Sequence, residues 1–371
     1  MSVLISESNR QPVSFALTMK DFEVKDEPPS EISQAYDFLF LFDKASGSPK
    51  VNYFMVDPRH PSQIFPKMNV FTMNAVKGIC SYRVVVLDNC IYILGGKDWE
   101  TGKHVADVSR FNPSTNVCEK LSPMKSPRCR FSAEVVGSHV YVVGGETKKG
   151  RITDSVERYD PSTDTWIDVK GLPRPRADHA SCSVGGNLYV TGGISNLKHQ
   201  SSNVFWMYNS DDDVWSEVSE GLAMPKEREK HNMVPVNGSA IFILGGRSFD
   251  HETFMEKDEG SVCQYSLMQE PDARRGPPWE LSHAPLPHTR TYAGAVALGK
   301  NIWVFGGFSH SAASHVSRVA MYDSHSRRWH ETFSLPPGNF TNVELCRLSI
   351  PVHNTSFTFL DKYICNKWVL W

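Results

Sequence analysis

The chain of 371 residues is long enough for two or three ordinary domains, or for one closed array of repeats. Apolar residues make up 40% of it and charged residues 22%, which is typical of a globular protein with a large core and excludes disorder over most of its length. The formal net charge of −2 provides no global field for nucleic acid or an anionic membrane, so we expect neither as a partner.

The eight cysteines form no Cys-x-x-Cys pair, and a chain of this size needs no disulfide framework, so we expect reduced thiols. The N-terminal stretch MSVLISESNRQPVSF lacks a basic segment followed by a long apolar run. No stretch approaches the roughly 18 consecutive apolar residues of a membrane-spanning helix. These features predict a cytoplasmic protein.

Residues 1–35 mix charges with prolines and show no sustained period, which predicts a partly ordered arm with one strand-like piece at residues 13–17. Residues 36–42, 53–58 and 64–65 then predict three strands. The first of them ends in Asp43-Lys44, where the later units have two glycines. Residues 36–67 are therefore interpreted as a degenerate first repeat unit.

Five clear units follow, and in each an apolar strand ends in two glycines. Such pairs supply positive φ angles and allow a second backbone to come close. The distance between successive pairs is roughly 50 residues, a period typical of propeller blades. The pairs are Gly95 and Gly96, Gly144 and Gly145, Gly192 and Gly193, Gly245 and Gly246, and Gly306 and Gly307.

A second register lies downstream of each glycine pair, where a tyrosine is followed by a tryptophan that we expect to pack between blades. The two residues are seven apart in most units, and an insertion at residues 269–276 stretches the spacing to fourteen in the fifth. In the first clear unit Phe111 and Cys118 hold these positions. The pairs are Tyr159 and Trp166, Tyr208 and Trp215, Tyr265 and Trp279, and Tyr322 and Trp329.

These repeated features resemble the kelch-repeat family, in particular the C-terminal propeller of BTB-BACK-kelch proteins. The match rests on the paired glycines, on Glu-Arg-Tyr-Asp-Pro at residues 157–161 and on the spaced tyrosine and tryptophan, and it covers residues 36–340. The resemblance implies an all-β fold, a six-bladed β-propeller of four-stranded antiparallel blades at residues 36–350. The blades are expected at residues 36–67 with 343–350, 75–124, 131–173, 179–225, 231–287 and 292–336.

The apolar stretch at residues 343–350 has no glycine pair behind it. We predict that it supplies the inner strand of the first blade and closes the ring, which removes the exposed edges of an open array. A seventh, partial blade that uses residues 356–360 is the alternative. Residues 351–371 are predicted to be a C-terminal tail, and the sequence assigns it no role.

Kelch propellers include copper oxidases similar to galactose oxidase, and such a site needs clustered imidazoles. The fourteen histidines are scattered without a His-x-His pair. His310 and His315 share a loop and are expected to be solvated, whereas His179 and His231 on predicted inner strands are expected in the core or the channel. We expect no metal, no cofactor and no enzymatic activity, although an enzyme that uses the central channel remains a second class of function.

In propellers similar to this one, partners dock on the loops between blades and on those that join the second strand to the third, here residues 97–103, 146–151, 194–201, 247–258 and 308–315. The interblade loops carry many basic residues, including Lys226 and Lys230, which predicts a basic rim. Because the guanidinium fork suits carboxylates, an acidic peptide is the expected ligand. Arg130, Arg151 and Arg174 lie outside the repeat register and are the preferred contacts. Further candidates are Arg128, Arg176, Arg228 and Arg290, for which a structural role is the competing interpretation, and the aromatic anchors Trp99 and Phe308.

The resemblance implies a protein-binding module, most directly the substrate-recognition propeller of a BTB-kelch adaptor for a cullin-RING ubiquitin ligase. Only 35 residues precede the first predicted strand, too few for a BTB domain, so a cullin is an expected partner only in a longer form. A stand-alone kelch scaffold and an actin-binding protein stay open as alternatives.

Overall fold

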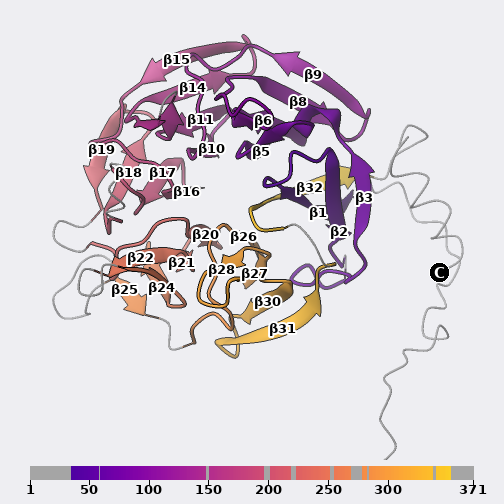
Figure 1. Ribbon diagram of the computed structural model, residues 1–371, viewed down its shortest axis with the longest axis vertical. Helices are drawn as coiled ribbons and strands as arrows, with labels where there is room; N and C mark the ends of the chain where they lie inside the picture. Colours follow the sequence, from indigo (N-terminus) through magenta and orange to yellow (C-terminus); the bar gives the residue numbers. More distant parts are fainter. Residues whose placement is uncertain are drawn as a thin grey trace, which may run out of the picture.

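Each repeat unit folds into one four-stranded antiparallel sheet, and six such sheets surround a central axis (Figure 1). The computed structural model describes residues 35–57, 59–147, 150–195, 201–218, 223–250, 255–268, 278–281, 284–336 and 340–351. The innermost strands of neighbouring blades contact each other all the way round the axis. The predicted six-bladed propeller is confirmed.

In blades 2 to 6 the chain enters at the axis and leaves at the rim. Blade 2 contains β5 (Arg83–Leu87), β6 (Cys90–Leu94), β8 (Val108–Asn112) and β9 (Val117–Leu121). Blade 3 contains β10 (Ser132–Val136), β11 (His139–Val143), β14 (Val156–Asp160) and β15 (Thr165–Val169). Blade 4 contains β16 (Ala180–Val184), β17 (Asn187–Thr191), β18 (Phe205–Asn209) and β19 (Val214–Glu217). Blade 5 contains β20 (Asn232–Val236), β21 (Ala240–Leu244), β24 (Val262–Ser266) and β25 (Trp279–Leu281). Blade 6 contains β26 (Gly294–Leu298), β27 (Asn301–Phe305), β30 (Arg318–Asp323) and β31 (Arg328–Ser334).

Blade 1 joins the two ends of the described chain. Its strands run from the axis outward as β32 (Val343–Pro351), β1 (Ala35–Asp43), β2 (Lys50–Met55) and β3 (Asn69–Thr72), and a short 3₁₀ helix, η2 (Asn74–Val76), leads on to blade 2. The yellow β32 lies against the indigo β1 in Figure 1, and their ladder extends from Ala35↔Pro351 to Asp43↔Val343. Ring closure by the C-terminal strand is therefore confirmed, and the alternative strand at residues 356–360 lies outside the described residues.

The outer strand of blade 1 differs from the prediction. Residues 64–65 were expected to form it, but Ile64 makes only an isolated bridge to Val56. Prolines at positions 61 and 66 flank this stretch, and a proline has no N–H to donate to a ladder. The strand forms instead at β3, beyond the expected boundary at residue 67.

The core is divided among the joints between blades. In the described part of the chain six apolar clusters form, and each takes residues from two adjacent blades. The cluster between blades 1 and 2, for example, packs Phe40 and Tyr53 of one sheet against Ile91 and Phe111 of the next. The second strand of each blade is buried on both faces, which explains why its sequence is a continuous apolar run. A single blade thus buries its apolar faces only against its neighbours.

The glycine pairs link neighbouring blades through backbone hydrogen bonds. Gly144 and Gly145 have φ angles of +57° and +99°, and the N–H of Gly145 donates to the carbonyl of Arg176 in the loop that enters the next blade, at 2.7 Å. The second glycine of three other pairs donates to the equivalent carbonyl at 2.9 Å. The expected positive φ and close backbone approach are confirmed.

The tyrosine–tryptophan pairs fasten the outer strands. The Tyr159 and Trp166 rings lie 5.0 Å apart, and Trp166 Nε1 donates to the carbonyl of Ser122 at the end of the preceding blade, at 2.9 Å. Tyr159 donates its hydroxyl to Asp164 at 2.7 Å. The other pairs have the same ring spacing within 0.2 Å, at 5.0, 5.0 and 5.2 Å. The repeat residues therefore hold neighbouring blades together.

Three predictions concern residues outside the described ranges, namely the arm at 1–34, the insertion at 269–276 and the tail beyond residue 351. Among the residues that the structure does describe, no helix is long and apolar enough to span a bilayer.

Candidate binding face

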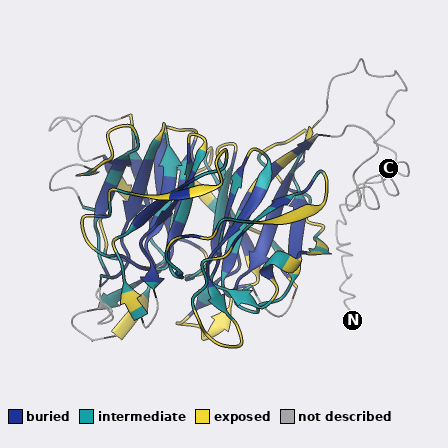
Figure 2. Cartoon of the chain, turned by 90° about the horizontal axis from the view of Figure 1, so that it is seen from above, coloured by how far each residue is buried: buried dark blue, intermediate teal, exposed yellow. Residues whose placement is uncertain are grey.

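One face of the ring is built from two sets of loops that are paired with each other. In blade 3 the interblade residue Cys129 bridges Glu146, which follows the glycine pair, and the same bridge recurs in other blades. In the described residues four short two-stranded sheets extend this face: β4 (Ile79–Cys80) with β7 (Lys97–Asp98), β12 (Glu146–Thr147) with β13 (Arg151–Ile152), β22 (Arg247–Asp250) with β23 (Met255–Asp258), and β28 (Phe308–Ser309) with β29 (Ser314–His315). We call it the loop face; exposed short strands project from it at the lower side of Figure 2. Its loops are held by backbone hydrogen bonds and present a firm platform.

The four arginines in the repeat register do not reach this face. Arg128, Arg176, Arg228 and Arg290 are all buried, with Arg128 and Arg228 at 0% exposure. Their burial favours the structural role that was the competing interpretation, because their guanidinium groups are used inside the joints. Arg128 Nη1 donates to the carbonyls of Gly144 and Ser155 at 2.8 and 3.1 Å.

The same arrangement repeats in two further blades. Arg228 donates to the carbonyls of Gly245 and Ser261, and Arg290 donates to those of Gly306 and Arg318, at 3.1 to 3.2 Å. Arg176 lies over the ring of Trp206 at 5.1 Å, a cation–π contact. For Arg128, Arg228 and Arg290 the near-constant spacing to the glycine pair therefore reflects the bond to the first glycine's carbonyl.

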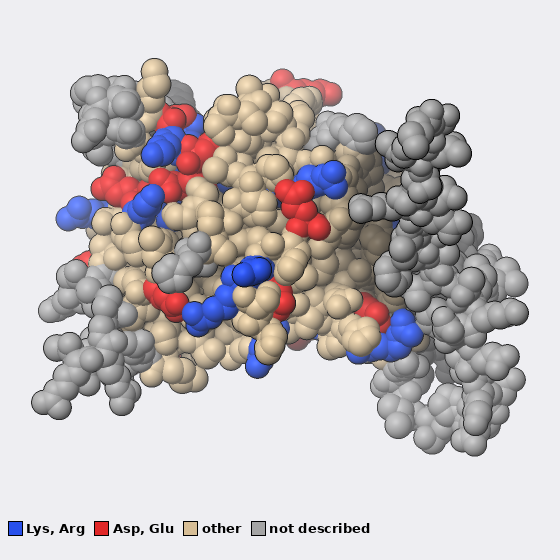
Figure 3. All heavy atoms as spheres, turned by 90° about the horizontal axis from the view of Figure 1, so that it is seen from below, with Lys and Arg blue, Asp and Glu red and all other residues tan. Residues whose placement is uncertain are grey.

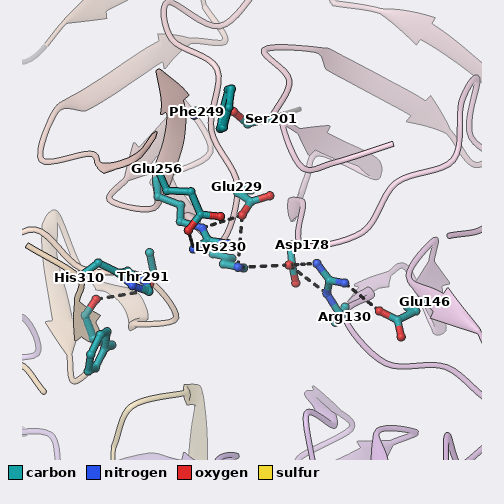
Figure 4. Close-up of polar contacts among 12 residues, drawn as sticks. Arg130, Glu146, Asp178, Ser201, Glu229, Lys230, Phe249, Glu256, Thr291 and His310 are labelled. Atoms are coloured by element: carbon teal, nitrogen blue, oxygen red, sulfur yellow. Dashed lines mark hydrogen bonds and ion pairs between the residues drawn. The ribbon is translucent and has the colours of Figure 1, made fainter. Parts of the chain in front are cut away.

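Arg130 is at the mouth of the channel but is already paired. It forms ion pairs with Asp178 and, through Nη1, with Glu146 at 2.8 Å. Figure 4 shows that these pairs continue across the loops as a chain: Asp178 lies 3.9 Å from Lys230, and Lys230 lies 3.3 Å from Glu229. We call the whole set the charge chain; it runs Glu146, Arg130, Asp178, Lys230, Glu229, Arg247 and Glu256.

The expected basic rim is therefore largely neutralised. Arg130 and Lys230 belong to the charge chain, and Lys226 pairs with Glu259 at 3.3 Å. Basic and acidic side chains also lie next to each other on the edge of the ring that Figure 3 presents. The loop face thus has mixed charge, and an acidic ligand has less positive surface to bind than the sequence suggested.

The backbone under the charge chain is fixed as well. Arg130, Asp178, Lys230 and Tyr292 all have φ between +52° and +56° at equivalent positions before the inner strands. Three of these N–H groups donate to the carbonyl of the equivalent residue in the previous blade, from Asp178 to Arg130 at 3.0 Å, Lys230 to Asp178 at 2.8 Å and Tyr292 to Lys230 at 3.2 Å. These bonds link four consecutive blades at the channel mouth and fix the backbone from which the charged side chains extend.

The channel itself has a volume of about 600 Å³ and is lined by the inner strands. Glu344 pairs in it with Lys44 and with Arg83, the latter at 2.8 Å. Burial, and after it the Arg83 charge, lowers the pKa of Lys44 to about 8. Glu134 accepts a hydrogen bond from Ser181 at 2.8 Å, and burial raises its pKa to about 7. These charges compensate each other within the channel, and we assign them no reaction.

Two buried histidines occupy the same repeat position, one residue before β16 and β20. His179 and His231 each share a hydrogen bond with a hydroxyl, at 2.9 and 2.8 Å respectively. Burial, and after it the charges of Arg83 and Arg176, lowers the pKa of His179 to about 3. Burial also lowers the pKa of His231 well below its ordinary value. Their predicted place in the core or channel is confirmed.

We expect these histidines to make the fold acid-sensitive. Below about pH 6.5 these histidines bind protons in the unfolded chain but not in the folded protein. For each histidine, the free energy of unfolding therefore falls by about 1 kcal/mol with every unit by which the pH is lowered. His179→Phe and His231→Phe introduce the residue that blade 3 has at Phe131 and should flatten this slope. Urea unfolding at several pH values measures it. His330→Phe, at an exposed site on β31, is the control, and an unchanged slope in the two buried-site variants would contradict neutral histidines.

The remaining predicted contacts do lie at the surface. Arg151 in β13 and Arg174 in the loop to blade 4 are exposed, and neither makes an ion pair with another described residue. Trp99, just after β7, is 56% exposed. Phe308 is half-buried, with its ring 5.0 Å from that of His310. Sequence reasoning missed Met255, which is 69% exposed at the start of β23 and has no counterpart in the repeat.

A second missed feature is a group of three metal-ligand types. His104, Cys129 and Glu146 bring one donor atom each to within 4.8 Å of one another, although they are far apart in the chain and match no spacing motif. The expectation of no metal site rested on such motifs. A bridge between the interblade loop and the loop after the glycine pair brings Cys129 to Glu146, and His104 reaches both from the loop of blade 2.

Comparison with known proteins gives a consistent result. Residues 81–269 match the family described as KLHDC2/KLHL20/DRC7 Kelch-repeats domain, and residues 289–332 match the Kelch motif. The solved structure titled "Structure of YjhT" superimposes with a TM-score of 0.62 at 14% identity, covering 77% of this chain and 95% of that one. This structural likeness concerns the fold alone.

Curated relatives match over much of the chain. Kelch-like protein 26 of Danio rerio is 27% identical over 74% of this chain and 44% of its own length. Kelch-like protein 21 of Danio rerio is 32% identical over 76% of this chain and 40% of its own length. Kelch repeat and BTB domain-containing protein 1 of Ectromelia virus (strain Moscow) is 29% identical over 50% of this chain and 34% of its own length. The chain thus spans less than half the length of these relatives.

Proposed function

Because this chain belongs to the kelch-repeat β-propeller family, a family of protein-binding modules, we propose that it recognises a protein partner through its loop face and presents that partner to a cullin-RING ubiquitin ligase, as an adaptor of BTB-kelch type. The relatives support this proposal through their arrangement. One of them carries a BTB domain in its name, and the matched propeller is only part of each. In a longer form of this protein, a BTB domain would contact the cullin and the propeller would bind the substrate.

The observation that carries the proposal is the exposed Trp99 on a fixed loop. The backbone N–H of Trp99 donates to the carbonyl of Gly78 at 2.8 Å. Gly47 packs so closely against this residue that a Cβ added to Gly47 would lie 3.3 Å from Trp99 Cβ. The backbone is thus held at the joint of blades 1 and 2 while the indole remains 56% exposed. Large aromatic side chains on rigid supports are the usual energetic centres of protein interfaces.

Arg151 and Arg174 add a charged contact on blade 3. They are the exposed arginines of the predicted set, and the charge chain leaves them unused. We propose that the partner combines an apolar group for Trp99 with carboxylates for these two arginines. Arg130 is left out of this contact because its guanidinium already serves Asp178 and Glu146.

The variant Trp99→Ala with Arg151→Glu and Arg174→Glu is expected to reduce partner capture by at least about tenfold, because hot-spot losses of this type exceed about 2 kcal/mol. Affinity capture with quantitative mass spectrometry, wild type against variant, measures this. The melting temperature should stay within a few degrees, since surface substitutions cost about 0.5 kcal/mol or less each.

Two substitutions elsewhere serve as matched controls. Lys300→Glu reverses an exposed charge in the turn between β26 and β27 on the opposite face, and Val117→Ala removes an exposed apolar side chain from β9. Both should capture partners as the wild type does. Capture that survives the triple variant, or that falls equally in the controls, would refute binding through this part of the loop face.

The alternatives predict other outcomes. Actin binding requires co-sedimentation with filaments, and a channel enzyme of the copper-oxidase type requires stoichiometric copper in purified protein. For the ligase role, captured partners should be ubiquitylated in a manner that depends on a cullin. Capture without such dependence would leave a stand-alone kelch scaffold.

A further inference from the structure

His104, Cys129 and Glu146 lie where blade 2 meets blade 3 on the loop face. Cys129 and Glu146 exchange two backbone hydrogen bonds, Cys129 N to Glu146 O at 3.0 Å and Glu146 N to Cys129 O at 2.7 Å. His104 comes from the loop of blade 2, where it bridges Lys97. Two blades therefore supply the three donors from backbone that is fixed by hydrogen bonds.

The His104 imidazole lies beside the other two donors, and its Nε2 is within ion-pair distance of Glu146. Its side chain is 7% exposed, and Nε2 lies 3.4 Å from Glu146 Oε1. That atom nevertheless makes no hydrogen bond with any residue in the described ranges. His179 and His231 also each have a buried ring nitrogen without a hydrogen bond, but among the described histidines only His104 brings its nitrogen close to both a thiol and a carboxylate. Cys129 is 1% exposed, so its thiol is also held within the group.

We propose that these three side chains bind a divalent transition-metal ion, with Zn²⁺ as the best fit. Imidazole nitrogen, thiolate sulfur and carboxylate oxygen together are the ligand types of zinc, whereas Ca²⁺ and Mg²⁺ take oxygen alone. The 3.4 Å between Nε2 and Oε1 is close to the separation of two ligands around a tetrahedral zinc with bonds of about 2.1 Å. The fourth position is open to water or to a group of the bound partner.

Binding is a simple exchange of a proton for a metal bond. The Cys129 thiol releases its proton to solvent as the sulfur–metal bond forms, and no oxidant or reductant takes part. Glu146 turns Oε1 to the metal and keeps Oε2 on Arg130. Lys97, whose Nζ lies 3.6 Å from Oε1, moves away from the ion. The site would join blades 2 and 3 at the Glu146 end of the charge chain.

Cobalt(II) titration of the chelator-treated full chain tests this proposal. We expect a near-ultraviolet thiolate-to-cobalt charge-transfer band that saturates at a single equivalent and is bleached by Zn²⁺. Cys129→Ser should abolish the band, and His104→Gln should weaken cobalt binding by about tenfold or more. Glu146 is left unchanged in the test because it also pairs with Arg130.

Controls separate this site from the other thiols and imidazoles. Cys118→Ser removes an exposed cysteine, and His310→Gln with His315→Gln removes exposed loop imidazoles. These variants should titrate as the wild type does. As a second readout, Zn²⁺ should raise the melting temperature of the wild type and leave that of His104→Gln nearly unchanged, which keeps the test valid if Cys129→Ser fails to fold. A wild type without the band, a band that persists in Cys129→Ser, or a band lost in Cys118→Ser would overturn the assignment.

Discussion

Alanine at Gly193 is expected to lower the free energy of unfolding by about 2–5 kcal/mol. Gly193 has a φ of +79°, and a Cβ there would lie 2.7 Å from both the carbonyl oxygen of Ala177 and the Cβ of His179. The left-handed backbone costs a non-glycine residue about 1–2 kcal/mol. Forcing a methyl group into occupied space adds about 1–3 kcal/mol. Urea unfolding with a constant m-value measures the sum.

Gly186 in the same blade provides the matched control. Its φ is +80°, and a Cβ added there would meet nothing within 4 Å. Gly186→Ala should therefore show the backbone contribution alone, about 1–2 kcal/mol. Equal losses at both positions would mean that close approach between loops contributes nothing, and that the repeat keeps these glycines for their φ angles only.

Glu157→Gln is expected to destabilise the protein by about 3–5 kcal/mol, the typical result of breaking a buried ion pair from one side. Arg128 and Glu157 are both 0% exposed and form an ion pair. The two carboxylate oxygens of Glu157 also accept the backbone N–H groups of Lys125 and Ser126, at 2.7 and 3.1 Å. Glutamine would leave the guanidinium charge uncompensated and direct an amide N–H₂ at one of these donors. The shift of the urea midpoint measures the loss.

Asp168→Asn makes the same chemical change at an exposed pair of blade 3. Asp168 lies 2.7 Å from Lys125 Nζ and is 65% exposed, so this substitution should cost about 0–1 kcal/mol. The double variant Arg128→Met, Glu157→Met should recover part of the loss, because it removes both buried charges. If Glu157→Gln lowers the free energy of unfolding no more than Asp168→Asn does, the buried ion pair is no more important for stability than the exposed one.

Much of the fold could be predicted because its determinants recur. Gly144 and Gly145 have the same neighbours as their copies, so the spacing alone indicated blades, and residues 343–350 were an apolar strand without a unit of their own. The outer strand of blade 1 could not be placed in this way. It has no repeat to align with, and the choice between residues 64–65 and β3 depends on ladder donors removed by two prolines.

The site was less predictable, because exposure is decided by three-dimensional packing. Arg128 and Arg174 are both arginines of interblade loops, yet one is buried against carbonyls and the other is exposed. The repeat register separated these two correctly. It did not separate Arg130 from Arg174, because the carboxylate of Asp178 comes from another blade, 48 residues further along the chain. A contact between residues so far apart in the sequence cannot be recognised from a local sequence pattern.

The pairing of β1 with β32 has a consequence for the order of the chain. Ala35 and Pro351 are directly opposite each other in the ladder, so the two ends of the described chain meet within one blade. Each apolar cluster depends on which blades are neighbours, and none depends on which blade is synthesised first. Joining these ends and opening the chain at a turn of the opposite face would preserve every joint. The packing between blades specifies their cyclic order, but it does not specify between which two strands the chain begins and ends.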